Sequence, residues 1–351
     1  MRLIAIGDIH GNIEAFKSVL GNVFQTYGNQ IDAFLFLGDY CCDFVEGEEC
    51  VQMMRELGKK YPIYAISGNR ETGMVKKYQE MRQKGNITWG LDSTMGAPLL
   101  SCRRMSEDVL FYLSELADEQ FICFDGTAPL YLVHKMPLDA KKIEELKQKG
   151  IKDILTAHTH EFQNQVYGTF HLMNPGSVGL IDEGRKGADY GVLTWKNEHW
   201  IFEGKHVDYD YEKMKGLITS NKELMENCKG WGEALLSSIE TGVNCCALYM
   251  FIKDILAEKN ATKSVKSISF GEGRYGNVSP QGGKLKDQIF IGEKEGVLDI
   301  KNVYYQTVEQ MQKYPVEEWM YEEALKLMKE YVYSLKEKGK LQGRILSQRR
   351  I

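Results

Sequence analysis

The chain has 351 residues, of which 43% are hydrophobic and 26% are charged, and its formal net charge is −5. These values are ordinary for a globular protein and exclude the disordered, collagenous and coiled-coil classes. The acidic balance also argues against a general nucleic-acid binder, because such proteins hold phosphate backbones with clustered Lys and Arg.

The N-terminal residues and the hydropathy of the chain predict a cytoplasmic protein. The apolar run before Gly7 is far too short for a signal-peptide core. No stretch approaches the roughly 18 apolar residues of a membrane span, so no membrane association is expected. The eight cysteines show no regular spacing, so we expect reduced thiols rather than a disulfide framework. Nothing in the sequence excludes a homo-oligomer.

The first third of the chain alternates short apolar runs with amphipathic stretches. Strands are predicted over residues 3–6, 33–37 and 63–66, and helices over residues 13–23 and 48–57. Such βαβαβ alternation predicts parallel strands that are joined by helical crossovers and covered by helices.

The middle of the chain begins with a segment rich in Gly, Thr and Ser, residues 86–101, which we interpret as a loop before a helix opened by Ser106 and Glu107. Short strands then predominate. They are predicted over residues 121–124 and 130–133 and near Ile154, Val166, Phe170, Val192 and Ile201, with a helix over residues 139–149. The simplest account places this set in a second sheet that faces the first.

The pattern changes to helices after Val207. Helices are predicted over residues 211–218, 224–227, 234–259, 303–312 and 316–338, with polar loops in residues 264–296. The expected fold is therefore α/β: two facing β-sheets flanked by helices in residues 1–207, followed by a mostly helical C-terminal extension in residues 208–351.

Polar motifs follow each of the first three predicted strands. These motifs are GDIHGN at residues 7–12, GD at residues 38–39 and GNRE at residues 68–71. Ligands bind at the carboxyl ends of the strands in a parallel sheet, so we expect the three motifs to converge at one edge.

The residues in these motifs are of metal-ligand types. Asp8 and His10 are two positions apart, so both side chains leave the same face if the strand continues through them. The same spacing recurs in a second pair of histidines after a later strand, and the Asp39 carboxylate has two oxygens with which to bridge two ions. The candidate set is Asp8, His10, Asp39, Asn69, His134, His158 and His160.

This set contains carboxylate, amide and imidazole groups and no thiolate. It suits Mn first and also Fe, Ni, Co or Zn, whereas Ca and Mg prefer all-oxygen sites and structural zinc sites use Cys. Seven ligands are too many for one ion. Two divalent ions about 3.5–4 Å apart, sharing a bridging carboxylate, would use all seven.

Taken in order, the motifs GDIH, GDY, GNRE, LVH and AHTH resemble those of the calcineurin-like metallophosphoesterase superfamily. The later NPGSVG at residues 174–179 resembles its small bacterial phosphodiesterase-like branch. The resemblance covers residues 1–207 and implies a sandwich of two mixed sheets with helices outside. It also implies metal-dependent hydrolysis of a phosphate ester, in which a water or hydroxide between the ions attacks phosphorus.

Carried over to this chain, the family pattern places one ion on Asp8, His10 and His160. The other ion lies on Asn69, His134 and His158, and Asp39 bridges the two.

One residue departs from the pattern, because Arg70 stands where many relatives carry a histidine that protonates the leaving group. Arginine stays charged and cannot be a general acid, but its planar fork pairs with phosphate oxygens. We expect Arg70 to be a catalytic residue and a substrate clamp beside Asn69, which we also expect to be catalytic. The alternative is a salt bridge to Glu71 or another nearby acid.

Two other polar residues each have two interpretations. Asn12 either donates to the phosphate of the substrate or caps the helix that starts at Ile13, and these roles are compatible. Asp43 either orients a ligating histidine or caps the helix beginning near Glu46. Cys41 and Cys42 are expected to pack beside the site rather than bind metal.

The sequence does not choose between phosphatase, phosphodiesterase and nuclease activity on a small-molecule or nucleotide phosphate ester. Loss of the usual histidine weakly favours a diester or an activated ester, whose leaving group needs less protonation. A competing interpretation is a catalytically weak, metal-bound scaffold for protein interaction, since the retromer's scaffolding subunit resembles the same family. The complete ligand set favours the enzyme.

Overall fold

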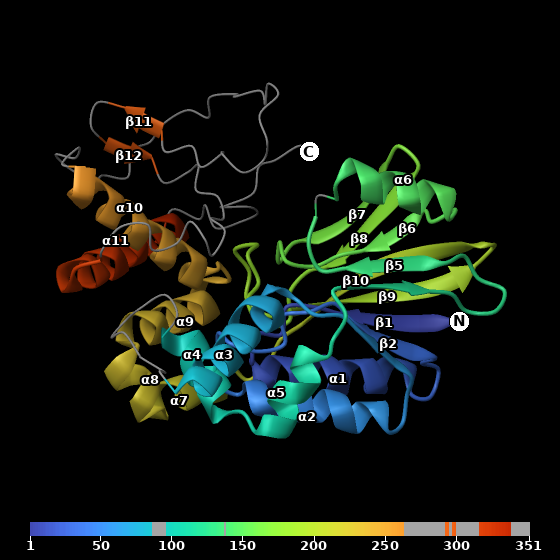
Figure 1. The fold of residues 1–351 in the computed structure, drawn as a ribbon, viewed down its shortest axis with the longest axis horizontal. Coiled ribbons are helices and arrows are strands. Elements are labelled where there is room, and N and C mark those ends of the chain that lie inside the picture. Colours follow the sequence, from blue (N-terminus) through green and yellow to red (C-terminus); the bar gives the residue numbers. More distant parts are fainter. Residues whose placement is uncertain (86–95, 137, 263–291, 295–296, 300–315, 338–351) are drawn as a thin grey trace.

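Two five-stranded sheets face each other at the centre of the protein and are flanked by helices (Figure 1). This computed structural model describes residues 1–85, 96–136, 138–262, 292–294, 297–299 and 316–337. Each sheet contains parallel and antiparallel pairs. The predicted α/β fold with two facing mixed sheets is confirmed.

The first sheet has the order β10-β9-β1-β2-β3. Its strands are β1 (Arg2–Ile6), β2 (Ala33–Phe36), β3 (Ile63–Ala65), β9 (Ala188–Lys196) and β10 (His199–Val207). The first three are parallel, and the crossovers are α1 (Ile13–Tyr27) and α2 (Gly47–Gly58). The predicted βαβαβ unit is therefore confirmed.

The strands near Val192 and Ile201 were assigned to the wrong sheet. They are β9 and β10, and β9 pairs antiparallel with β1, with Leu3 opposite Leu193. The free side of β1 accepts this hairpin because β2 occupies only the other side.

The second sheet has the order β4-β5-β6-β8-β7. Its strands are β4 (Glu119–Ile122), β5 (Leu130–Val133), β6 (Asp153–Leu155), β7 (Phe162–Tyr167) and β8 (Phe170–Pro175). Helix α6 (Ala140–Gln148) joins β5 to β6 and covers the outer face. Buried side chains from both sheets, including Leu35, Leu132 and Trp200, form the core between them.

The helices that follow β3 and precede β4 in the chain pack beside the carboxyl ends of β1 to β3. They are the π-helix η1 (Arg70–Val75), α3 (Lys76–Lys84), α4 (Gly96–Arg104) and α5 (Glu107–Ser114). The loop predicted over residues 86–101 is wrong for residues 96–101, while residues 86–95 lie outside the described part. The helix forms because Pro98 stands in its first turn, where proline is tolerated, and Leu99 and Leu100 are buried. Ser106 caps α5 as predicted.

The C-terminal extension is helical wherever it is described, apart from a short hairpin of β11 (Gly292–Lys294) and β12 (Val297–Asp299). Its helices are α7 (Tyr211–Ser220), α8 (Lys222–Asn227), α9 (Lys229–Thr241), α10 (Cys245–Thr262) and α11 (Glu318–Glu337). The predicted helices over residues 234–259 and 316–338 correspond to α9, α10 and α11. The helix predicted over residues 303–312 lies outside the described residues.

The single helix predicted over residues 234–259 is wrong, because the chain turns at Gly242. This glycine ends α9 in a left-handed conformation, with φ of 67°. Buried side chains of the extension, such as Trp231 and Tyr249, share one core with the helices of the first sheet. The boundary between residues 207 and 208 as a division into domains stays a prediction.

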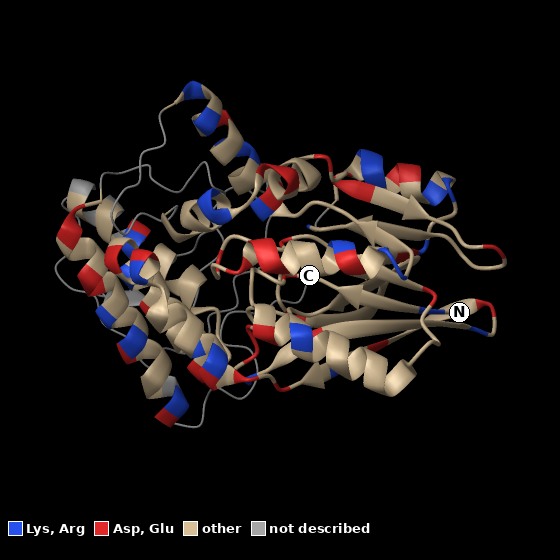
Figure 2. Cartoon of the chain, turned by 90° about the horizontal axis from the view of Figure 1, so that it is seen from below, with Lys and Arg blue, Asp and Glu red and all other residues tan. Residues whose placement is uncertain are grey.

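The extension lies on the side of the molecule towards which β1 and β2 run (Figure 1). Lys and Arg alternate with Asp and Glu along the outer helices, whereas the strands are mostly uncharged (Figure 2). None of the described helices combines the length and the apolar character needed to cross a membrane.

Candidate metal centre

The loops after five strands bring all seven predicted ligands together. Asp8 and His10 follow β1, Asp39 follows β2 and Asn69 follows β3, while the three remaining histidines follow strands of the second sheet. The carboxyl ends of strands from both sheets therefore meet at one edge, as predicted for the first sheet.

The ligand atoms form two groups. Asp8, His10 and His160 make one group, and Asp39, His134 and His158 make the other, with the ligand atoms of each group within 4.8 Å of one another. Asn69 joins the second group, since its Oδ1 lies 3.1 Å from Nε2 of His134. This is the grouping that the sequence resemblance implied.

Asp39 lies between the two groups. Its Oδ2 is 3.9 Å from Nε2 of His10 and 3.6 Å from Nε2 of His134. Its other oxygen accepts a hydrogen bond from the backbone N–H of Arg70 at 2.7 Å. One carboxylate oxygen is thus held by the backbone while the other faces ligands of both groups.

The hydrogen bonds of the histidines direct their Nε2 lone pairs into the centre. Nδ1 of His134 donates to the Leu37 carbonyl at 2.7 Å, and Nδ1 of His160 donates to the Leu180 carbonyl at 2.5 Å. Nδ1 of His10 faces the Asp43 carboxylate at 2.5 Å. A neutral imidazole with its hydrogen on Nδ1 has a lone pair on Nε2, the atom with which it binds metal.

Two features of the first group fit a bound cation. The Nε2 atoms of His10 and His160 lie 3.0 Å apart, and two lone pairs at that distance repel each other unless a cation or a proton lies between them. Oδ1 of Asp8 is buried without a hydrogen-bond partner and lies 3.7 Å from Nε2 of His160. A buried unpaired carboxylate oxygen is costly, and a metal ion would satisfy it.

Burial sets the charge of these groups. It lowers the pKa of His160 to about 3, helped by the neighbouring His10, so that the imidazole stays neutral. It also raises the pKa of Asp8 to about 7. A divalent ion would offset the cost of this buried charge and favour the ionised carboxylate.

The backbone at the ligands is left-handed. Positive φ values of 53° to 71° occur at Asp8, His10, Asp39, His158 and His160. The expectation that the strand continues through Asp8 and His10 is therefore wrong, since β1 ends at Ile6. Residues other than glycine seldom adopt this conformation, and its concentration in five ligands marks a site where function outweighs local strain.

Glu71 organises the site, a role that was not predicted for it. Its carboxylate accepts backbone hydrogen bonds from Asp39 and Gly68 at 2.8 Å and from Tyr40 at 2.9 Å. These bonds tie the loop after β2 to the loop after β3. The loops approach so closely that a Cβ at Gly68 would lie 2.2 Å from Oδ1 of Asp39. The sequence signal for this role of Glu71 was its place in the GNRE motif.

The turn of residues 174–179 ties two further ligand loops together. The Asn174 amide donates to the Ala157 carbonyl at 3.0 Å, and the Ser177 hydroxyl donates to the Asp8 carbonyl at 2.9 Å. Both side chains therefore fix the backbone of ligand loops.

Arg70 forms an ion pair with Asp43. Its Nε and Nη2 lie 2.8 and 2.7 Å from the two carboxylate oxygens, and the same carboxylate binds Nδ1 of His10. The alternative of a salt bridge to a nearby acid is thus confirmed, and Asp43 contacts the predicted ligand His10 as the orienting interpretation requires. Asp43 does not cap α2, whose N-cap is Glu46. Contact of Arg70 with a phosphate stays a prediction.

Asn12 caps helix α1. Its side chain is fully buried, and its Oδ1 accepts from the backbone N–H of Ala15 at 3.1 Å. Its Nδ2 donates to the Gly179 carbonyl at 3.1 Å and to the Tyr209 hydroxyl at 3.3 Å. The capping role is confirmed, and the predicted phosphate contact stays a prediction.

Replacement of Asn12 by alanine is expected to lower the free energy of unfolding by about 2 kcal/mol, since it removes a cap and the bond to Gly179. Urea denaturation of the variant measures this change. Ser106→Ala is the matched control, because it removes a cap together with exposed bonds to Glu48 and should cost about 1 kcal/mol. An unchanged stability combined with a tenfold higher KM would support the substrate-binding interpretation.

The cysteines are all free, and those predicted to pack beside the site do so. Sγ of Cys42 lies 3.0 Å from that of Cys41 and 3.4 Å from that of Cys102, and all three are buried. None of them belongs to a ligand group.

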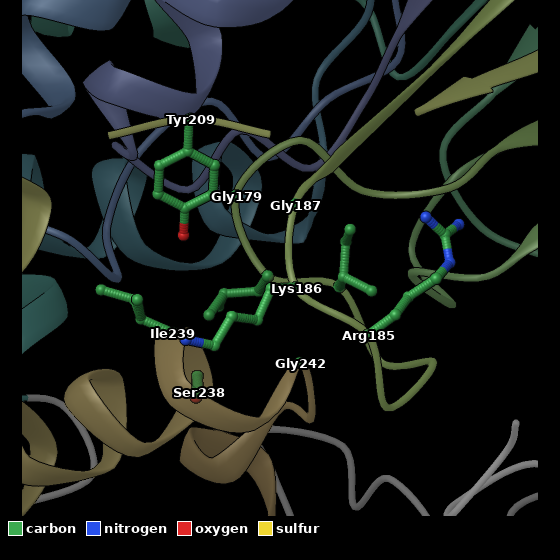
Figure 3. Close-up of a pocket in the computed structure, with 10 residues that line it drawn as sticks. Gly179, Arg185, Lys186, Gly187, Tyr209, Ser238, Ile239 and Gly242 are labelled. Atoms are coloured by element: carbon green, nitrogen blue, oxygen red, sulfur yellow. The ribbon is translucent and has the colours of Figure 1, made fainter. Parts of the chain in front are cut away.

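A small pocket lies between residues 179–187 and the end of α9 (Figure 3). Lys186, Tyr209 and Ser238 are among the side chains that line it. The volume open to the centre of a water molecule is about 10 Å³, which leaves room for about one water. The pocket is therefore too small for a phosphate ester.

Residues 1–162 match the family described as calcineurin-like phosphoesterase, and this stretch contains all seven ligands. This part of the chain is a calcineurin-like phosphoesterase domain. The match of this domain supports a metal-dependent phosphoesterase. Its family and the two ligand groups of the structure thus agree on metal-dependent chemistry.

Relatives of this phosphoesterase are distant in sequence. An uncharacterized protein of Methanocaldococcus jannaschii is 23% identical over 239 residues, which cover 63% of this chain and 93% of the relative. The crystal structure of a hypothetical protein from Pyrococcus horikoshii shares the fold with a TM-score of 0.51 and 16% identity, covering 65% of this chain and 96% of that one. The crystal structure of a metallophosphoesterase from Sphaerobacter thermophilus gives a TM-score of 0.48 and 19% identity, covering 69% of this chain and 99% of that one.

Proposed function

We propose that this phosphoesterase hydrolyses its substrate at a centre of two divalent ions. The position of Asp39 carries the proposal, because one of its oxygens faces ligands of both groups. Asp8, His10 and His160 would hold one ion, and Asn69, His134 and His158 the other.

Two bound ions would supply a nucleophilic water that is deprotonated near neutral pH and would offset the charge of the phosphate. The chain's own residues prepare this arrangement. Backbone carbonyls and Asp43 fix the tautomers of three histidines. Glu71 and the backbone N–H of Arg70 hold the Asp39 loop. Such preorganisation removes the cost of arranging the ligands during the reaction.

The donor set supports manganese first and iron, nickel, cobalt or zinc as alternatives, because it mixes imidazole with carboxylate and amide oxygens.

We propose a small-molecule or nucleotide phosphate ester as the substrate. Arg70 cannot donate a proton, which favours a diester or an activated ester over an ordinary monoester. Reduced buried cysteines agree with a cytoplasmic location, which is part of the proposal.

Removal of metal is expected to abolish hydrolysis of bis(p-nitrophenyl) phosphate, and two equivalents of manganese should restore it. The measurement compares the chelated protein with protein reconstituted with each of the five metals, using this diester and p-nitrophenyl phosphate. Inactivity against both substrates with every metal would overturn the proposal. If such a protein still bound two ions, the metal-bound scaffold would be the better explanation. A panel of nucleotides, cyclic nucleotides and phosphorylated metabolites would then identify the substrate.

A further inference from the structure

His10 is oriented differently from His134 and His160. Nδ1 of His134 and Nδ1 of His160 donate to backbone carbonyls, whereas Nδ1 of His10 faces the side chain of Asp43. A carboxylate partner fixes the ring of a ligating histidine and increases its basicity more than a carbonyl does. Of these three histidines, His10 is the one whose orientation depends on a side chain.

Asp43 is fully buried, so its charge needs a partner inside the protein. Arg70 supplies that partner with two nearly parallel hydrogen bonds of 2.8 and 2.7 Å, one to each oxygen. Such a bidentate fork fixes the plane of the carboxylate as well as its charge. A lysine ammonium would provide charge without this geometry.

Arg70 is fixed at both ends. Its backbone N–H donates to Oδ1 of Asp39, and its side chain has an exposed fraction of only 18%. The loop that carries Asp43 is also tied to His10 through the backbone, since the N–H of Phe44 donates to the His10 carbonyl at 2.8 Å. The direction of the guanidinium is therefore set by Asp43, and turning it towards a phosphate would remove both of its bonds to this buried carboxylate and leave His10 as its side-chain partner.

We propose that Arg70 and Asp43 are positioning residues that hold His10 for the ion of the first group, and that Arg70 does not clamp the substrate. This inference rests on the proposed two-ion centre. It explains how arginine is used at the position after Asn69. The guanidinium of Arg70 acts on His10 through Asp43, and the backbone N–H of Arg70 holds Asp39.

Manganese titration of the full-length protein by calorimetry tests the inference, with the variants Arg70→Ala, Arg70→Lys and Asp43→Asn. Wild type is expected to bind two ions. In Arg70→Ala and Asp43→Asn we expect the affinity for one ion to fall by about 10- to 100-fold while the other affinity is kept. Arg70→Lys should fall between. In Arg70→Ala and Asp43→Asn, the spin-coupled electron paramagnetic resonance signal of a manganese pair should disappear when metal is limiting.

Kinetics at high manganese separate the two roles of Arg70. A positioning residue acts through metal occupancy, so excess manganese should return KM of Arg70→Ala to within about threefold of wild type. Arg55→Ala is the matched control, because it breaks an arginine–aspartate pair on the surface and should leave both affinities unchanged. Thermal melting of the metal-free variants shows whether they fold. If Arg70→Ala does not fold, Asp43→Asn carries the test, because it preserves the volume of the side chain.

An Arg70→Ala or Asp43→Asn variant that binds two ions with wild-type affinity overturns the positioning role. A KM of Arg70→Ala that stays at least tenfold higher at saturating manganese makes Arg70 a substrate clamp. Failure of the proposed function looks different, because the wild-type protein itself would then bind fewer than two ions or hydrolyse neither test ester.

Discussion

Replacement of Asp39 by asparagine is expected to reduce hydrolysis by at least about a thousandfold, which corresponds to about 4 kcal/mol of transition-state stabilisation. The variant keeps the size of the side chain and one oxygen. It loses the negative charge between the two ligand groups, where Oδ2 lies within 4 Å of imidazole nitrogens from both. The measurement is kcat/KM for an aryl phosphodiester at saturating manganese, together with the number of ions bound per chain.

The matched control for this variant is Asp108→Asn. Asp108 is exposed and pairs with Arg55 on the surface, so its loss should leave kcat/KM unchanged. Retention of more than a tenth of the activity by Asp39→Asn would contradict a bridging role. Loss of activity without loss of bound ions would instead indicate that the charge of Asp39 acts on the nucleophile.

Strand order made part of the site predictable. Parallel strands place their carboxyl ends at one edge, so the first four ligands could be brought together from the alternation of apolar runs and polar motifs. Which strand pairs with which in a sheet depends on residues that are far apart in the sequence. The hairpin of β9 and β10 therefore had no sequence signal to show that it pairs with β1 rather than with the second sheet.

The conformation of the ligands was not predictable. A run of Asp, Ile and His after a strand suggests continued extension, but the chain turns left-handed at Asp8 and again at His10. The cost of those turns is offset by contacts from distant residues, such as the bond from Ser177 to the Asp8 carbonyl. The partner of Arg70 was equally hidden, since the chain offers several acids nearby and only the fold selects Asp43, 27 positions away.

Replacement of Glu71 by alanine is expected to lower the free energy of unfolding of the metal-free protein by about 3 kcal/mol and to weaken metal binding. The change leaves the backbone N–H groups of Asp39, Tyr40 and Gly68 without their acceptor. Each buried unpaired donor costs about 1–3 kcal/mol, and water entering the space offsets part of the sum. Urea denaturation without metal separates the loss of stability from the loss of metal binding.

Two further variants show whether the acceptor itself matters. Glu71→Gln keeps one oxygen and should retain part of the stability, whereas Glu107→Ala removes an exposed acid and should change the unfolding free energy by less than about 0.5 kcal/mol. If Glu71→Gln matched wild type in both stability and manganese affinity, the carboxylate would not be the group that holds the two loops. The expected order, with Glu71→Ala weakest in both measurements, would instead mean that this acid holds the loops of Asp39 and Asn69 together before any metal binds.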